Sequence, residues 1–230
     1  MGRWGWRLFE GDQDMDAACS LAEPLGFQMD DWEHTMSSMV HQTDMLAGAA
    51  ARAFYRTEEY KQELESAIVP YVRAKLDTDN LGDRLFAAAR AQENNPTLPS
   101  TKYRTIILGA LMMRAGARIK PADLQHLRDL IPQIQCNAQF VLPLVDEGFR
   151  SPGRAQFLAA LDHYQVGVPR NYQEPSCFQC GQVRDDIGHA LVQCARCHVA
   201  YYCDKECQRH HWQEHKPSCV SPEQRRTANV

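Results

Sequence analysis

The chain has 230 residues, a length that suggests one ordinary domain or one domain and a small module. Its 25 lysines and arginines are outnumbered by 29 aspartates and glutamates, and the net charge of −4 disfavours a strongly basic nucleic-acid-binding protein. The longest apolar run, residues 106–113, is far shorter than the roughly 20 residues of a membrane span, so no membrane protein is expected.

Residues 1–166 are predicted to form a helical domain with few strands. Apolar residues recur there at steps of three and four, the period of a helix with one buried face. The pattern runs through residues 36–54, 60–72, 81–88, 124–134 and 157–164. Residues 105–116 are apolar almost all round, which is typical of a helix in the centre of a bundle. The expected fold class is therefore mainly α.

Prolines and polar residues mark the expected boundaries of these segments. Pro70 and Pro132 fall inside helical patterns, so each should kink or end its helix. Thr101 suits a helix cap, and Pro121 suits a first helical turn. Residues 167–176 contain two prolines and a glycine without any period, which predicts a linker, and residues 220–230 are polar and predicted to be a disordered tail.

Seven of the nine cysteines lie in the 43 residues from 177 to 219. No export signal is visible near the start of the chain, so we expect an intracellular protein of the cytoplasm or nucleus, where thiols stay reduced. Seven cysteines do not pair evenly as disulfides, but they suit metal binding if a histidine supplies an eighth ligand. The candidate ligands form four close pairs, which are Cys177 with Cys180, Cys194 with Cys197, Cys203 with Cys207, and His215 with Cys219.

Four ligand pairs match two zinc ions, each held by two pairs in a tetrahedron. The spacing of Cys203 and Cys207 puts both on one face of a helix, which is predicted to begin near Asp204, a suitable cap, and to be stopped by Pro217 just after His215.

Spacing alone leaves the histidine ligand open. His198 directly follows a cysteine, and His211 lies one helical turn from both Cys207 and His215, so both compete with His215. His189 and His210 are expected to face solvent or to lie outside the ligand set.

The run YYCDKECQRHHWQEHKPSC, preceded by CFQC and CARC, resembles the MYND-type zinc finger, whose signature ends in Cys-x3-Cys-Gln, a Trp, His-Lys and a final Cys. Gln208, Trp212, His215 and Lys216 stand at the corresponding positions. The resemblance implies a cross-brace, in which alternate pairs share an ion, and it selects His215 as the ligand, with His211 as the alternative. It thereby implies one ion on Cys177, Cys180, Cys203 and Cys207, and a second ion on Cys194, Cys197, His215 and Cys219.

The thirteen residues between Cys180 and Cys194 form a longer gap than we expect of that family, so residues 181–193 are predicted to be a lengthened loop. The small apolar core of the finger is assigned to Phe178, Tyr201, Tyr202 and Trp212. Such a core is too small to hold the fold alone, and zinc, which contributes on the order of 10–16 kcal/mol in such modules, should bind and fold it in one event.

Residues 1–166, including the opening WGWRLFEGDQDMD, also resemble the helical region of fungal proteins that end in this finger. The whole chain is thus interpreted as a helical domain of residues 1–166, a linker of residues 167–176, a double-zinc finger of residues 177–219, and a tail of residues 220–230.

The function expected from these features is protein–protein interaction without catalysis. Both zinc ions have four protein ligands and no open position, which makes them structural, and no nucleophile–base pair or phosphate-binding loop is visible. The resemblance implies an adaptor that binds protein partners, among them short proline-containing peptides. The alternatives are a transcriptional or chromatin regulator that acts through partners, and a degenerate relative of the lysine methyltransferases that carry this finger, although no methyltransferase motif is recognised in residues 1–166.

Residues 12–23 have the carboxylate spacing of a calcium loop, with Asp12, Asp14, Asp16 and Glu23 at the ligand positions. Ala17 stands where such a loop needs glycine, so we expect an acidic, solvated segment and helix start instead.

Overall fold

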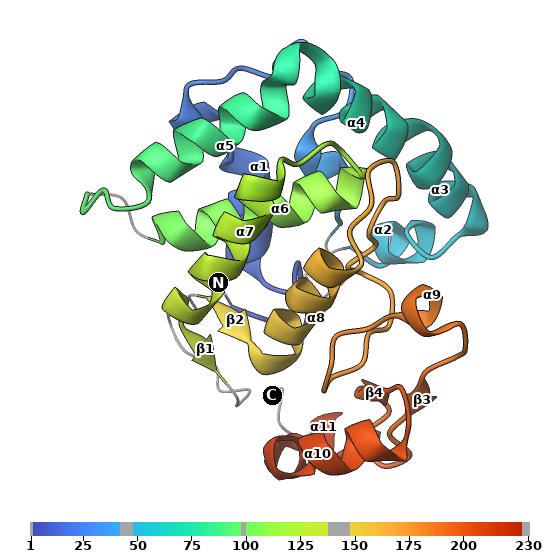
Figure 1. Ribbon diagram of the computed structural model, residues 1–230. Helices are drawn as coiled ribbons and strands as arrows, with labels where there is room; N and C mark the ends of the chain where they lie inside the picture. Colours follow the sequence, from blue (N-terminus) through green and yellow to red (C-terminus); the bar gives the residue numbers. More distant parts are fainter. Residues whose placement is uncertain (1, 42–47, 98–99, 138–147, 227–230) are drawn as a thin grey trace.

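The computed structural model describes residues 2–41, 48–97, 100–137 and 148–226, and it is mainly helical, as predicted (Figure 1). Its helices are α1 (Asp12–Ser20), α2 (Ala49–Phe54), α3 (Glu58–Glu63), α4 (Val69–Asp77), α5 (Leu81–Gln92), α6 (Thr101–Ala115), α7 (Pro121–Leu130), α8 (Ser151–Asp162), α9 (Arg184–Ile187), α10 (Lys205–His215) and α11 (Pro222–Arg226). Short 3-10 turns are η1 (Glu23–Leu25), η2 (Met36–Met39), η4 (Thr78–Asn80), η5 (Ile131–Gln133) and η6 (Lys216–Ser218), and η3 (Leu64–Ile68) is a π-helical turn. Strands β1 (Cys136–Asn137) and β2 (Phe149–Arg150) pair in parallel, and β3 (Val192–Gln193) and β4 (Tyr201–Tyr202) pair antiparallel.

Helix α6 lies at the centre of the helical body, as its apolar sequence predicts (Figure 1). It packs against α1, α4, α5, α7 and α8, and its residues from Thr105 to Ala115 are all buried. Gly109 lets α7 approach closely, because a Cβ at that position would come within 2.6 Å of Leu127 Cδ1. Among the described residues, no helix combines the length and the hydropathy that crossing a membrane requires.

The prediction of one helical face over residues 36–54 is wrong. Only η2 forms at its start, and the backbone of Val40 is extended. Thr35 and Ser38 form a capping box that starts η2, in which Ser38 Oγ accepts the amide proton of Thr35 at 3.1 Å, and the turn ends at Met39. Helix α2 begins at Ala49, and Phe54 at its end is exposed and not buried as expected. Thr43 and Leu46 lie outside the described residues.

Pro70 does not end its helix. The chain is helical from α3 through η3 to α4, and Pro70 lies in the first turn of α4, where a missing amide proton costs least. The preceding π-helical turn absorbs the change, since the amide of Val69 donates to the carbonyl of Leu64. Helix α7 begins at Pro121 and ends just before Pro132, both as predicted. Thr101 is the first residue of α6 and does not cap it. Its hydroxyl donates to the carbonyl of Glu93 at 2.8 Å.

Residues 2–11 form a loop that joins distant parts of the chain. Arg3 is buried and pairs with the fully buried carboxylate of Asp14 at 3.1 Å, and its Nη2 donates to the carbonyl of Gly148 at 2.9 Å. The amide of Leu8 donates to the side chain of Gln156 in α8 at 3.2 Å. The expected acidic helix start is present, but Asp14 is buried in an ion pair and not solvated as expected.

The segment after α8 follows the helical body toward the finger. Tyr172 is fully buried in the main core beside Phe9, with ring centroids 5.6 Å apart, and the side chain of Gln173 donates to the carbonyl of His41 at 2.6 Å. A second, smaller core follows at Cys177. The predicted tail begins with the short helix α11, and residues 227–230 of it lie outside the described residues. The domain boundaries themselves stay a prediction.

Candidate metal centre

The C-terminal finger is built from a β-hairpin and the helix α10. Strands β3 and β4 pair with Val192 opposite Tyr202, and α10 follows β4 directly. Asp204 caps α10, because its carboxylate accepts the amide proton of Cys207 at 2.8 Å. The helix ends at His215, and Pro217 follows in η6, so the predicted start and end of this helix are confirmed.

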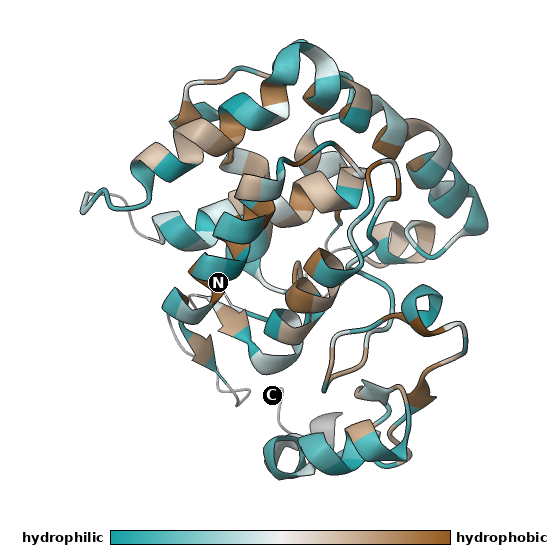
Figure 2. Cartoon of the chain, in the orientation of Figure 1, coloured by the Kyte–Doolittle hydropathy of each residue, from teal (hydrophilic) through white to brown (hydrophobic). Residues whose placement is uncertain are grey.

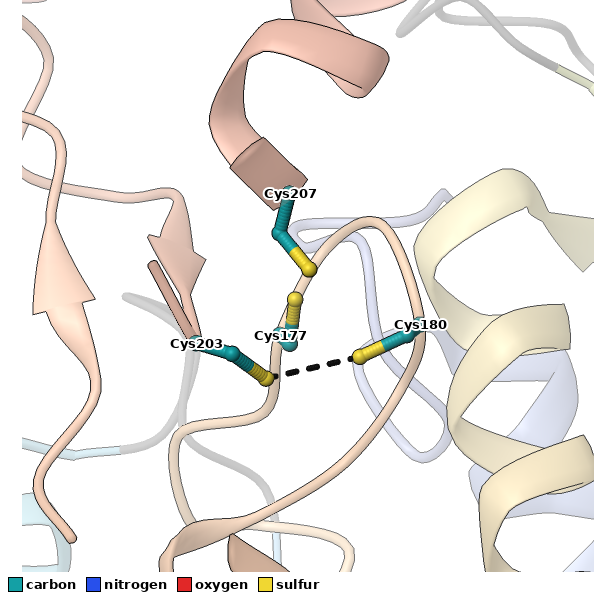
Figure 3. A group of neighbouring side chains, drawn as sticks. All are labelled: Cys177, Cys180, Cys203 and Cys207. Carbon is teal, nitrogen blue, oxygen red and sulfur yellow. Dashed lines mark hydrogen bonds between the residues drawn. The ribbon is translucent and has the colours of Figure 1, made fainter. Parts of the chain in front are cut away.

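The first ligand cluster joins two segments of the finger (Figure 3). Cys177 and Cys180 lie on a tight turn, closed by a 2.8 Å bond from the amide of Gly181 to the carbonyl of Cys177, whereas Cys203 follows β4 and Cys207 lies in the first turn of α10. The four sulfurs point toward one another within 4.8 Å, and those of Cys180 and Cys203 are 3.4 Å apart. Cys177 is buried and the other three are half-buried.

The second cluster is more enclosed. It gathers Cys194 and Cys197 beside β3 with His215 at the end of α10 and Cys219 after η6, and all four are buried. The sulfurs of Cys194 and Cys219 are 3.8 Å apart, and Cys197 Sγ is 3.6 Å from His215 Nε2. The amide of Val199 donates to Cys197 Sγ at 3.5 Å, a contact that favours a thiolate.

The geometry and the donor set fit zinc. Sulfur ligands about 2.3 Å from a tetrahedral zinc ion are about 3.8 Å from each other, close to the observed sulfur separations. A hydrogen bond from Cys180 lowers the pKa of Cys177 and favours its thiolate form. Burial, followed by the neighbouring His211, lowers the pKa of His215 to about 4, which keeps the imidazole in the neutral form that binds metal. The two clusters are consistent with two zinc ions, one on four cysteines and one on three cysteines and a histidine.

The competing histidines lie outside both clusters. His211 is buried, and its Nδ1 is 3.1 Å from the hydroxyl of Tyr202, so it supports the finger core. His198 is exposed in a left-handed turn at φ 56°, where its Nε2 is 2.8 Å from the carbonyl of Ala195. His189 and His210 are exposed, as expected.

The core of the finger differs from the expectation in one residue. Phe178 and Tyr202 are buried in it and Tyr201 is half-buried, but Trp212 is 39% exposed on the outside of α10. The tryptophan that packs against this core is Trp6, from the other end of the chain. No local pattern could reveal Trp6, because its contact depends on how the two ends of the chain meet.

Comparisons with known proteins agree with this geometry. Residues 177–219 match the family model described as the MYND finger. N-lysine methyltransferase SMYD2-A of Danio rerio is 34% identical over 85 residues, which cover 32% of this chain and 19% of the relative. N-lysine methyltransferase SMYD2 of Homo sapiens is 33% identical over 85 residues, with the same coverage, so the match spans about a fifth of the length of these curated relatives. No solved structure matches the chain significantly.

Proposed function

We propose that this chain, whose residues 177–219 match the MYND finger, binds other proteins through that finger. Zinc shapes the finger, and the finger contacts the partners. Cys177, Cys180, Cys203 and Cys207 hold one ion, and Cys194, Cys197, His215 and Cys219 hold the other. The observation that carries this proposal is the pair of closed four-ligand clusters. With four protein ligands each, the ions have no position for water or substrate and act structurally.

MYND fingers mediate protein–protein interactions, and this finger exposes apolar groups that suit such a contact. Val192 in β3 is 51% exposed and Trp212 on α10 is 39% exposed. Figure 2 shows α10 as mostly hydrophilic. Exposed aromatic and aliphatic groups in a polar setting suit short proline-containing peptides, whose preformed extended helix loses little entropy on binding.

The 85 residues shared with the SMYD2 methyltransferases surround the finger and make up 19% of those proteins. This similarity supports the finger and carries no assignment of methyltransferase activity to the chain.

The test is binding of a library of proline-containing peptides by the full chain, measured by fluorescence anisotropy after zinc counting by mass spectrometry. The wild-type chain should carry two zinc ions and bind a subset of the peptides, and Cys203→Ala should lose that binding. Val192→Ser should weaken binding severalfold with both zinc ions retained, whereas Val166→Ser, at a valine that is 58% exposed outside the finger, should not. Equal binding by the wild type and Cys203→Ala would overturn the proposal.

A further inference from the structure

One face of α10 combines positive charge with an exposed tryptophan. Four exposed residues follow one another along this face at steps of four, three and four, and they are Lys205, Arg209, Trp212 and Lys216. Because each residue turns a helix by about 100°, these steps place the four side chains within about 60° of one another around the helix axis. Lys216 follows the last residue of α10, but its backbone is still helical, at φ −50° and ψ −44°. We call these four residues the basic stripe.

The cations of the basic stripe have no acidic partner. In the part of the chain that the structure describes, none of the three forms an ion pair. The carboxylates of Glu206 and Glu214 lie on other sides of α10, about 120° and 160° from Trp212 around the axis. Glu214 Oε2 is instead 3.9 Å from His211 Nε2. The sequence of α10 therefore separates its charges and leaves the positive ones on the face that carries the tryptophan.

Exposed cations on other helices differ in this respect. Lys61 in α3 pairs with Glu58 at 2.6 Å, and Arg128 in α7 pairs with Asp162 of α8 at 2.7 Å. A cation with a carboxylate beside it has little charge to offer a partner, whereas the three cations of the basic stripe keep theirs. This face is thus complementary to a partner that brings carboxylates.

The length of the basic stripe fits a short extended segment. The eleven residue steps from Lys205 to Lys216 cover about 16 Å along a helix. An extended proline-containing segment advances about 3.1 Å per residue, so five or six of its residues span this distance. With an apolar residue of the segment on Trp212, Arg209 lies about 4.5 Å to one side along the axis and Lys216 about 6 Å to the other. Acidic residues one or two positions from that apolar residue can reach both cations.

Phosphate groups of a nucleic acid fit this face less well. Proteins that bind nucleic acid strongly neutralise roughly 6–10 phosphates, and the basic stripe supplies three cations. The chain as a whole has a net charge of −4 and repels a long polyanion, but a short acidic segment meets only the local positive charge.

We infer that the basic stripe makes the finger selective for acidic partners, namely extended segments in which aspartate or glutamate flanks an apolar residue on both sides. The inference rests on the proposed function and adds the charge of the partner to it. Trp212 supplies the apolar contact, and the three cations discriminate between partners and speed their association. Because all four residues are exposed, salt weakens this selection.

Fluorescence anisotropy of three labelled peptides with the full-length, zinc-loaded chain tests the inference. Each peptide has a Pro-Leu-Pro centre, and both of its ends carry two glutamates, two serines or two lysines. At about 50 mM salt the glutamate peptide should bind roughly fivefold to tenfold more tightly than the serine peptide, the effect of a few exposed charge pairs, and the lysine peptide should bind most weakly. At about 500 mM salt the preference should fall below about twofold.

Charge reversal locates the preference on the helix. Arg209→Glu and Lys216→Glu should each remove most of the preference for glutamate and leave the affinity for the serine peptide unchanged. Arg184→Glu is the matched control, because it makes the same change at an exposed position of α9 and should keep the preference. Zinc is counted in every variant, and Arg209→Glu keeps the test valid if Lys216→Glu, next to a ligand, loses an ion.

Three results would overturn the inference. Equal binding of the glutamate and serine peptides by the wild type contradicts it and leaves the proposed function intact, whereas failure of every peptide to bind contradicts the proposed function as well. A preference that survives both Arg209→Glu and Lys216→Glu removes it from the basic stripe. A labelled strand of eight thymidines that binds more tightly than the glutamate peptide, and loses this binding in Arg209→Glu, assigns the stripe to nucleic acid instead.

Discussion

The ring of Trp6 packs against that of Phe178, with centroids 6.2 Å apart and planes inclined at 50°. Phe178 follows the first cysteine of the finger, and its amide donates to the carbonyl of Tyr201 at 2.8 Å. The N-terminal loop is thus part of the surface on which the finger rests.

Replacing Trp6 by alanine should lower the free energy of unfolding. Truncation of a buried tryptophan costs about 3–5 kcal/mol, and because Trp6 is half-buried we expect about 1–3 kcal/mol, measured by urea unfolding followed by circular dichroism. Trp212→Ala removes the same group from an exposed position and should cost less. A larger cost for Trp212→Ala would contradict the packing described here.

The two ions should leave the protein at different rates. Three of the four ligands in the first cluster are half-buried, whereas all four in the second are buried, so a chelator reaches the first ion more easily. Zinc release into excess chromogenic chelator should show a fast and a slow phase of equal size. Cys203→Ser should remove the fast phase and Cys219→Ser the slow one, and the reverse assignment would refute the prediction.

Asp14→Asn should be strongly destabilising. The buried carboxylate accepts hydrogen bonds from both Nη atoms of Arg3 at 3.1 Å and from the hydroxyl of Tyr103 at 2.8 Å. An asparagine removes the charge of Asp14 from the buried guanidinium, and breaking a buried ion pair in this way costs about 3–5 kcal/mol. Thermal and urea unfolding should show this loss, while Asp16→Asn, an exposed carboxylate two residues away, should change stability by less than about 0.5 kcal/mol.

Ionisation of Glu174 should lower the free energy of unfolding as the pH rises. Burial, partly opposed by Arg170, raises its pKa from 4.5 to about 7. The folded state therefore binds the proton of Glu174 more tightly than the unfolded state. The stability that this proton contributes is present in full below pH 4.5 and is lost as the pH rises through 7.

Glu174→Gln should accordingly stabilise the protein more at pH 8 than at pH 5, with a difference on the order of 2 kcal/mol in urea unfolding with excess zinc. Glu59→Gln, at an exposed position of α3, serves as the control and should show no such trend. A gain that is the same at both pH values would show that Glu174 is not held in a desolvated site.

Local patterns predicted the structure well where the structure depends on neighbours in sequence. The ligand spacing and the cap at Asp204 depend on a few adjacent residues, and the all-apolar run of α6 predicted a central helix. The helix expected over residues 36–54 does not form as one element, because apolar periodicity does not reveal that the chain leaves the short turn η2 for an extended backbone at Val40.

The docking of the finger was not predictable, because it depends on pairs far apart in the sequence. The lengthened loop was visible as thirteen residues between two cysteines, but its purpose depends on Arg170 and His163 lying opposite Asp186 and Gln182. Trp6 is a similar case, since nothing near it in the sequence indicates a partner in the finger.

The loop of residues 2–11 has a consequence for synthesis of the protein. Arg3 bonds Gly148 and Arg7 donates to the carbonyl of Glu174, partners that are 145 and 167 residues later in the chain. At about 5–20 residues per second, a ribosome exposes residues 3–7 on the order of ten to thirty seconds before these partners emerge. During that interval Arg3 lacks its contact with Gly148, and Trp6 lacks its contact with Phe178, so the nascent chain offers a chaperone a defined early target.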